Sequence, residues 1–215
     1  MKRILVFLPI LVNIFITVNS CKDLNQKTIV EKTVGQDVIK KIPKDIYGRN
    51  YPYYNMAQEY TKDVGLNPLN DGFDSIFLRI WYPYRSNVQV IDIKKIVEKW
   101  DAEYHSMEID LINDKLHAVN IKTQQIHPES GWNSFTSNLF SLNILNMPHQ
   151  SELSGYESGD ADGTSITVEI ATRKSYRIYS YTNPNVHLEF PEAKQMENIM
   201  ELIEKELGVK RHEIF

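Results

Sequence analysis

One stretch of the chain combines acidic residues and a glycine at spacings that could bind a cation. Residues 158–169 read SGDADGTSITVE, and on a twelve-residue calcium-binding loop Asp160 and Asp162 would occupy ligand positions three and five. Gly163 would make the sharp turn, and Glu169 would be the bidentate ligand at position twelve. A serine replaces the first aspartate, however, and the strand pattern that follows predicts that Glu169 projects from a solvated face, away from the loop. We therefore expect hydrated acids in a loop leading into a hairpin, with Asp160 and Asp162 as a weak calcium candidate and no other metal site.

The histidines and possible nucleophiles form no recognisable catalytic pattern. None of the six histidines stands at the i,i+4 spacing of a helical zinc pair; they are His105, His117, His127, His149, His187 and His212. A two-residue turn at Asn113-Asp114 would make Asp110 face His117 and point His105 to the other face, so that these histidines share no metal. G-x-S-x-G elbows, phosphate loops and dinucleotide fingerprints do not occur in the sequence. No catalytic residue and no cofactor is predicted. A pair of carboxylates that act together in a hydrolase is defined by their distance in space, which a sequence does not show.

Tyrosine is unusually frequent, with twelve in the chain. The strand pattern predicts an outward face formed by Arg177, Tyr179 and Tyr181, with Trp81 and Tyr84 as neighbours. Tyrosine and arginine on such a face are typical of interface anchors, which makes these five residues the candidate binding surface. Tyrosine also suits strands through β-propensity alone, so a structural role stays open.

Alternating side chains predict a largely antiparallel sheet of about six strands. The clearest strand is Ser75–Tyr82, in which apolar positions recur with a period of two until Pro83 ends the run. The other predicted strands are Val88–Ile93, Lys99–Met107, Leu116–Thr123, Thr164–Thr172 and Lys174–Tyr181. Short links between successive strands favour antiparallel pairing.

Two helices are predicted, one after each group of strands. Ser130 can cap the first, whose apolar stripe is Trp132, Phe135, Leu139 and Leu142. Pro191 suits the first turn of the second, which carries its apolar stripe to Leu207 and stops at Gly208. This order of elements predicts a single α+β domain over residues 46–215, with both helices covering one face of the sheet.

The N-terminal residues have the pattern of a cleavable export signal. Lys2 and Arg3 precede an apolar run that ends at Val18, and the run would reach roughly 22 Å as a helix, short of the roughly 30 Å of a hydrocarbon core. The chain's only cysteine, Cys21, follows at once, and with Val18 and Ser20 before it this segment resembles the lipobox of bacterial lipoproteins. The resemblance implies removal of residues 1–20 and acylation of both the Cys21 thiol and the new amino terminus. An ordinary secretory leader with a chance cysteine is the alternative.

Removal of residues 1–20 would change the formal charge from −4 to −6. An acidic chain without basic clusters binds phosphate backbones poorly, so nucleic acid is not an expected partner. Polybasic attraction to anionic lipid is not expected either, which leaves acyl chains on Cys21 as the membrane anchor. Residues 21–45 are polar, with few large aliphatic side chains, and are predicted to be a flexible tether.

These observations predict a lipid-anchored lipoprotein of the cell envelope, on the outer rather than the inner membrane, facing the periplasm or the exterior. We expect a non-catalytic binding or envelope-interaction module whose partner is an envelope protein or a glycan. The alternative is a periplasmic or surface hydrolase acting on glycan or peptide.

Overall fold

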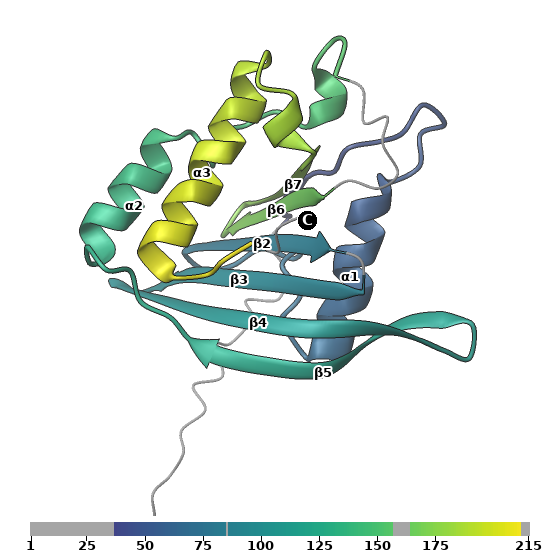
Figure 1. Cartoon of the computed structure of the whole chain (residues 1–215), viewed down its shortest axis with the longest axis horizontal. Helices are drawn as coiled ribbons and strands as arrows, with labels where there is room; N and C mark the ends of the chain where they lie inside the picture. The colour runs from purple at the N-terminus through teal and green to yellow at the C-terminus, as the bar shows by residue number, and fades with distance from the viewer. Residues whose placement is uncertain (1–36, 85, 157–163, 212–215) are drawn as a thin grey trace, which may run out of the picture. The chain divides into compact units, whose positions relative to one another are not determined.

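Seven strands form one sheet in the computed structural model, which describes residues 37–84, 86–156 and 164–211, with only the backbone of Tyr84 (Figure 1). The strands are β1 (Ile39–Lys41), β2 (Ile76–Tyr84), β3 (Asn87–Ile96), β4 (Lys99–Ile112), β5 (Lys115–Gln125), β6 (Ser165–Thr172) and β7 (Ser175–Thr182). Their order in the sheet is β1-β7-β6-β2-β3-β4-β5. Only β1 and β7 run parallel, and every other neighbouring pair is antiparallel. The predicted α+β class with a largely antiparallel sheet is confirmed, with seven strands in place of six.

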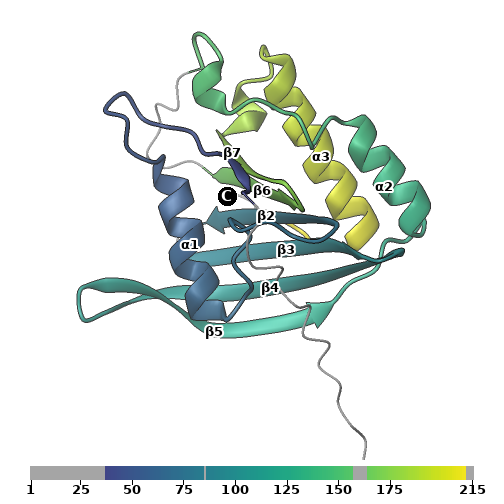
Figure 2. The same cartoon turned by 180° about the vertical axis from the view of Figure 1, so that it is seen from behind.

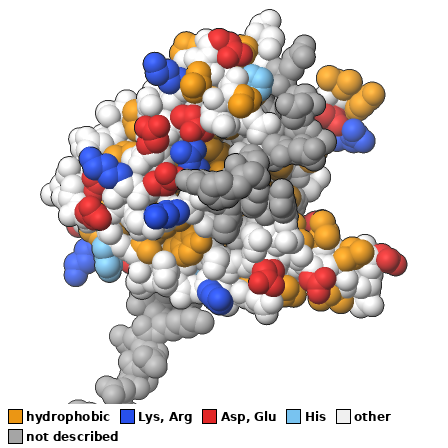
Figure 3. Space-filling model, viewed as in Figure 1, with side chains coloured by type: hydrophobic (Ala, Val, Ile, Leu, Met, Phe, Trp, Pro, Cys, Tyr) orange, Lys and Arg blue, Asp and Glu red, His pale blue; other side chains and the backbone are white. Residues whose placement is uncertain are grey.

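Three helices pack on this sheet, namely α1 (Pro52–Val64), α2 (Trp132–Ser141) and α3 (Pro191–Leu207), and two short 3-10 turns, η1 (Gln150–Glu152) and η2 (Pro184–Val186), lie in the connections. The apolar stripes of α2 and α3 cover one face, where Phe135, Leu139 and Met196 share a core with Leu78 and Ile80 of β2. Charged side chains of both signs lie on this side of the molecule (Figure 3), for example the exposed Glu201 and Lys205 of α3, whereas α2 contains no charged residue. The N-cap residue of α2 is Gly131, with no side-chain cap hydrogen bond, so the predicted cap at Ser130 is wrong. The backbone N–H of Ser130 instead donates to the carboxylate of Glu206 near the end of α3.

The two predicted helices share one face of the sheet, as expected, and a third helix that was not predicted, α1, covers the opposite face (Figure 2). Ala57 and Tyr60 of α1 pack with Phe77, Trp81 and other residues of a second core. The helix begins with Pro52 and ends at Gly65, which has the left-handed conformation (φ 70°). Pro52 and Gly65 are signals of a helix start and end, but three of the first nine residues of α1 are tyrosine, which favours strands.

The edge strand β1 lies within residues 21–45, the segment that the sequence predicts to be a tether. Ile39 to Lys41 form β1, which pairs with β7 from Ile39 opposite Ser175 to Lys41 opposite Arg177. Val38 and Ile42, on either side of the strand, pack against the α1 core. The tether predicted over residues 21–45 is therefore wrong for its last part, and its residues before Asp37 lie outside the described residues.

The β4–β5 hairpin has the predicted turn and register. Asn113 and Asp114 both have positive φ (51° and 60°), as a two-residue hairpin turn of type I′ requires, and Asp110 lies opposite His117. A bulge between Ser106 and Glu108 then shifts the pairing by one residue. The two hairpin histidines contact different groups: His105 hydrogen-bonds Thr123, and His117 lies 3.4 Å from a carboxylate oxygen of Asp63.

Turn η1 is held by a buried histidine. His149 Nδ1 accepts a hydrogen bond from the backbone N–H of Ser151 (3.0 Å), while the backbone N–H of His149 donates to Glu152 (3.0 Å). The imidazole ring also lies 4.4 Å from the ring of Tyr51. Burial lowers the pKa of His149 to about 4, despite the opposing charge of Glu152, so the native side chain is neutral at pH 7.

This packing predicts a pH dependence of stability. Between pH 6.5 and about pH 4 the unfolded chain binds a proton at residue 149 and the native chain does not, so the free energy of unfolding falls as the pH falls, by up to about 3 kcal/mol. His149→Asn keeps a capping side chain and removes this titration, so urea unfolding from pH 7 to pH 5 should show a flatter profile for the variant. Burial also lowers the pKa of His105, which supplies a residual slope of the same sign. An identical profile for both proteins would contradict the prediction.

Candidate functional site

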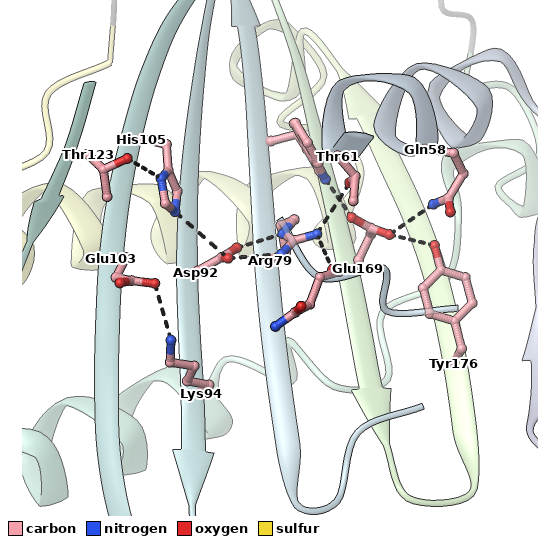
Figure 4. Close-up of polar contacts among 12 residues, drawn as sticks. Gln58, Thr61, Arg79, Asp92, Lys94, Glu103, His105, Thr123, Glu169 and Tyr176 are labelled. Carbon is pink, nitrogen blue, oxygen red and sulfur yellow. Dashed lines mark hydrogen bonds and ion pairs between the residues drawn. The ribbon is translucent and has the colours of Figure 1, made fainter. Parts of the chain in front are cut away.

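A row of charged side chains crosses the sheet beneath α1. Glu169 on β6 lies opposite Arg79 on β2, Arg79 lies opposite Asp92 on β3, and Asp92 lies opposite Glu103 on β4. Directly opposite residues of antiparallel strands share a face, so the register alone lines up these four side chains (Figure 4). Glu169, Arg79 and Asp92 are buried, at 0 to 2 % exposure, whereas Glu103 lies at the partly open end of the row.

Arg79 and Asp92 form a bidentate ion pair at the centre of the row. The guanidinium donates from Nε to Oδ1 (2.7 Å) and from Nη2 to Oδ2 (2.9 Å) of Asp92. Its remaining nitrogen, Nη1, donates to the hydroxyl of Thr61 on α1 (3.3 Å) and to the carbonyl of Asn67 just after α1 (3.1 Å). Burial by itself would lower the pKa of Arg79, but the carboxylates of Asp92 and Glu169 more than offset it, and the pKa is raised. The guanidinium therefore stays charged, and its hydrogen bonds connect α1 to the sheet.

Beside this pair, the carboxylate of Glu169 accepts a second set of hydrogen bonds. Its carboxylate accepts from the indole N–H of Trp81 (2.6 Å) and from the hydroxyl of Tyr176 (2.7 Å), and Gln58 of α1 donates to it at 3.4 Å. The prediction of a solvated Glu169 is therefore wrong, because α1 covers the face on which it projects. Burial and the neighbouring carboxylate of Glu169 raise the pKa of Tyr176, so its hydroxyl keeps its proton and donates it to the hydrogen bond.

His105 and Lys94 extend the row toward its open end. His105 Nδ1 lies 2.9 Å from the hydroxyl of Thr123, and its Nε2 lies 3.9 Å from Asp92 Oδ2. Burial lowers the pKa of His105 more than Asp92 and Glu103 raise it, so the ring is neutral at pH 7. Lys94 bridges Glu103 (3.1 Å) and Asp101 (3.5 Å) at the partly exposed edge of the network.

This network contains residue types that could do acid–base chemistry, but its geometry is that of a structural element. Two carboxylates, a histidine and a tyrosine lie near one another, as in many active sites. The Glu169 oxygens are both engaged by donors, as are those of Asp92, and the side chains are covered by α1. A substrate would have to displace α1 to reach them.

The predicted tyrosine surface is not an exposed face, so that prediction is wrong. Tyr179 and Tyr181 are fully buried in the core under α2 and α3. Their hydroxyls donate to the carbonyls of Ile144 (2.6 Å) and Pro148 (2.8 Å), and Arg177 donates to the carbonyls of Leu145 and Met147. Three alternate residues of β7 thus hold one segment, residues 144–148, between α2 and η1. The sequence shows which residues share this strand face but not which segment covers it.

The remaining candidate residues lie apart. Trp81 is fully buried under α1 with its indole N–H on Glu169, the side chain of Tyr84 lies outside the described part of the chain, and so do Asp160 and Asp162. Within the described residues, no group of three or more His, Cys, Asp or Glu side chains could hold a metal ion. An open hollow of about 330 Å³ lies between α2 and α3, and Glu201 is the only carboxylate among its lining residues.

Comparison with family models, with curated proteins and with solved structures finds no match to this chain. In the portion that the structure describes, no helix is both long enough and apolar enough to cross a membrane.

The Arg79–Asp92 pair predicts a characteristic order of stabilities. Asp92→Asn leaves a buried guanidinium without its counter-charge and should lower the free energy of unfolding by about 3–5 kcal/mol. The double change Arg79→Met with Asp92→Leu removes both charges at similar volume and should cost less than Asp92→Asn alone. Urea unfolding at pH 7 measures all three proteins.

Glu103→Gln is the matched control, because it removes a carboxylate from the same row at its partly exposed end, and about 0–1 kcal/mol should be lost. A double variant that is no more stable than Asp92→Asn alone would contradict the interpretation of the pair as a coupled unit.

Proposed function

We propose that this chain is a cell-envelope lipoprotein, anchored in a membrane by acyl chains on Cys21, whose folded unit acts as a non-catalytic binding or envelope-interaction module. The observation that carries the proposal is the single cysteine placed directly after a basic start and an apolar run, with Val18 and Ser20 before it. Two or more acyl chains on one residue give stable attachment, whereas one chain gives only marginal binding. An outer-membrane position, with an envelope protein or a glycan as the partner, belongs to the same proposal.

The arrangement of polar groups supports binding in preference to hydrolysis. The cluster richest in ionisable groups is enclosed between α1 and the sheet, and its carboxylates are already engaged by donors. Several large apolar side chains, in contrast, are exposed in turns and near strand ends of the same unit: Ile46, Tyr47, Val97, Leu111, Leu116, Val186 and Leu188. Exposed apolar groups mark contact surfaces when they occur together.

The anchor is tested by the mass and the partitioning of the protein purified from membranes. The intact mass should correspond to a chain beginning at Cys21 with acyl groups added, and the protein should enter the detergent phase on Triton X-114 separation. Cys21→Ser should lose the acyl mass and move to the aqueous phase.

Ser20→Ala is the matched control, because it changes the adjacent residue, keeps it small and leaves the thiol, so this variant should remain acylated. A native protein with a free thiol at Cys21, or with residues 1–20 still attached, would contradict the proposal.

A further inference from the structure

The segment between β1 and α1 is a short turn fixed by its own hydrogen bonds. Lys44 and Asn50 form an antiparallel bridge, and Asp45 closes the turn by accepting from the backbone N–H groups of Tyr47 (2.8 Å) and Arg49 (2.9 Å). The guanidinium Nε of Arg49 also donates to Asp45 (2.7 Å). Gly48 supplies the positive φ (77°) that this tight turn requires. The turn therefore holds its shape without support from a partner.

The tip of this turn carries the most exposed large apolar side chain of the described residues. Ile46 is 91 % exposed and Tyr47 is 75 % exposed, and the guanidinium of Arg49 lies 5.1 Å from the centre of the Tyr47 ring. In Figure 1 the turn protrudes from the folded unit beside α1, and Figure 3 shows apolar side chains next to charged ones at the same place. Apolar groups held in this way keep their surface in water unless something covers them.

Basic residues surround this tip, although the chain as a whole is acidic. Residues 39–50 contain four lysines and arginines and one acid, a local formal charge of +3, so the expectation of no basic cluster fails here. Lys40, Lys41 and Arg49 form ion pairs with Asp71, Glu152 and Asp45, at 3.5, 3.4 and 2.7 Å respectively. Lys44, in contrast, hydrogen-bonds only the neutral amide of Asn50 among the residues that the structure describes. A tyrosine and an aliphatic residue flanked by lysine and arginine are the composition of a membrane–water interface anchor.

We infer that residues 44–49 make a second contact with the lipid bilayer, in which Ile46 and Tyr47 enter the interfacial region and Lys44 and Arg49 face anionic headgroups. The inference rests on the proposed function, because the acyl anchor on Cys21 brings this turn to the membrane. Fifteen residues separate Cys21 from Asp37, and this length can span up to about 55 Å. The turn begins at Lys44, three residues after the end of β1, so few residues separate it from this link.

A lipid surface fits this turn better than a protein groove. The two apolar side chains stand at the apex with charges behind them, which suits shallow insertion into a fluid layer. The β4–β5 tip has the reverse order, because the polar Asn113 and Asp114 form its apex and the apolar Leu111 and Leu116 lie behind it. Entry of the β4–β5 tip into a bilayer would first bring a carboxylate into the headgroups.

The test places an environment-sensitive probe at the apex of the turn in the full-length acylated protein. The acyl group occupies the Cys21 thiol, so Tyr47→Cys provides a single site for an NBD label, and Leu188→Cys, at a residue 52 % exposed, provides the matched control site. The proteins are reconstituted into vesicles of phosphatidylethanolamine and phosphatidylglycerol. The label at position 47 should shift to shorter wavelength and be quenched several-fold more strongly by doxyl-labelled lipid than the label at position 188.

Two further changes separate apolar insertion from charge attraction. Ile46→Ser should abolish the lipid quenching at position 47, whereas Leu111→Ser, which removes an exposed aliphatic side chain elsewhere, should leave it unchanged. Lys44→Gln should weaken the contact about fivefold on the anionic vesicles and leave it unaltered on phosphatidylcholine vesicles.

The outcomes distinguish a failure of the lipid contact at residues 44–49 from a failure of the acyl anchor at Cys21. Acylated, vesicle-bound protein whose label at position 47 is as open to aqueous iodide as the label at position 188 would overturn the lipid contact and leave the anchor intact. Shielding that arises only after envelope proteins are added would also overturn it, in favour of a protein partner. If the intact mass shows no acyl group, the proposed function fails, and the label on Tyr47→Cys in a Cys21→Ser background, which again has a single thiol, then decides by its quenching at saturating lipid whether the turn binds lipid.

Discussion

The pairing of Arg79 with Asp92 is the interaction on which the α1 side of the fold depends. A guanidinium buried to this extent is tolerated only with a counter-charge and a full set of acceptors, and Asp92, Thr61 and Asn67 supply both. Thr61 lies on α1 and Asn67 just beyond it, so the same contacts that satisfy the charge also fix the helix over the sheet. Displacement of α1 would leave the guanidinium short of acceptors. The charged row therefore holds α1 against the sheet.

The two faces of the sheet use different chemistry for the same purpose. Under α2 and α3 the contacts are chiefly apolar. The polar groups of Arg177, Tyr179 and Tyr181 on β7 donate hydrogen bonds to backbone carbonyls of residues 144–148. Under α1 an apolar core surrounds a polar row, in which Glu169 and Arg79 lie side by side. A single helix covers that face, and the polar row ends near Lys94 and Glu103, where the cover ends.

The sequence is informative about local structure and much less so about what covers it. The alternation in residues 75–82 and the turn at Asn113-Asp114 are local properties, and both the strand and the hairpin register follow from them. Whether Tyr179 faces water depends instead on residues 144–148, which are more than thirty positions away. The predicted solvated position of Glu169 fails for the same reason, because α1, which covers it, lies more than one hundred positions away in the sequence. The sequence shows which charged residues each strand carries but not that they form one row. The row of Glu169, Arg79, Asp92 and Glu103 arises only because β6, β2, β3 and β4 are neighbours in the sheet.

The central claim is that α1 stays closed over the charged row, which makes the row a structural element and not a reaction site. Amide hydrogen exchange of the native protein tests this claim most directly. We predict that the amides of α1 and those of β2 and β3 exchange through the same global opening, with equal free energies. Exchange of α1 at a much lower free energy than the strands beneath it would contradict the claim, because Asp92, His105 and Glu169 would then be open to solvent in a populated state.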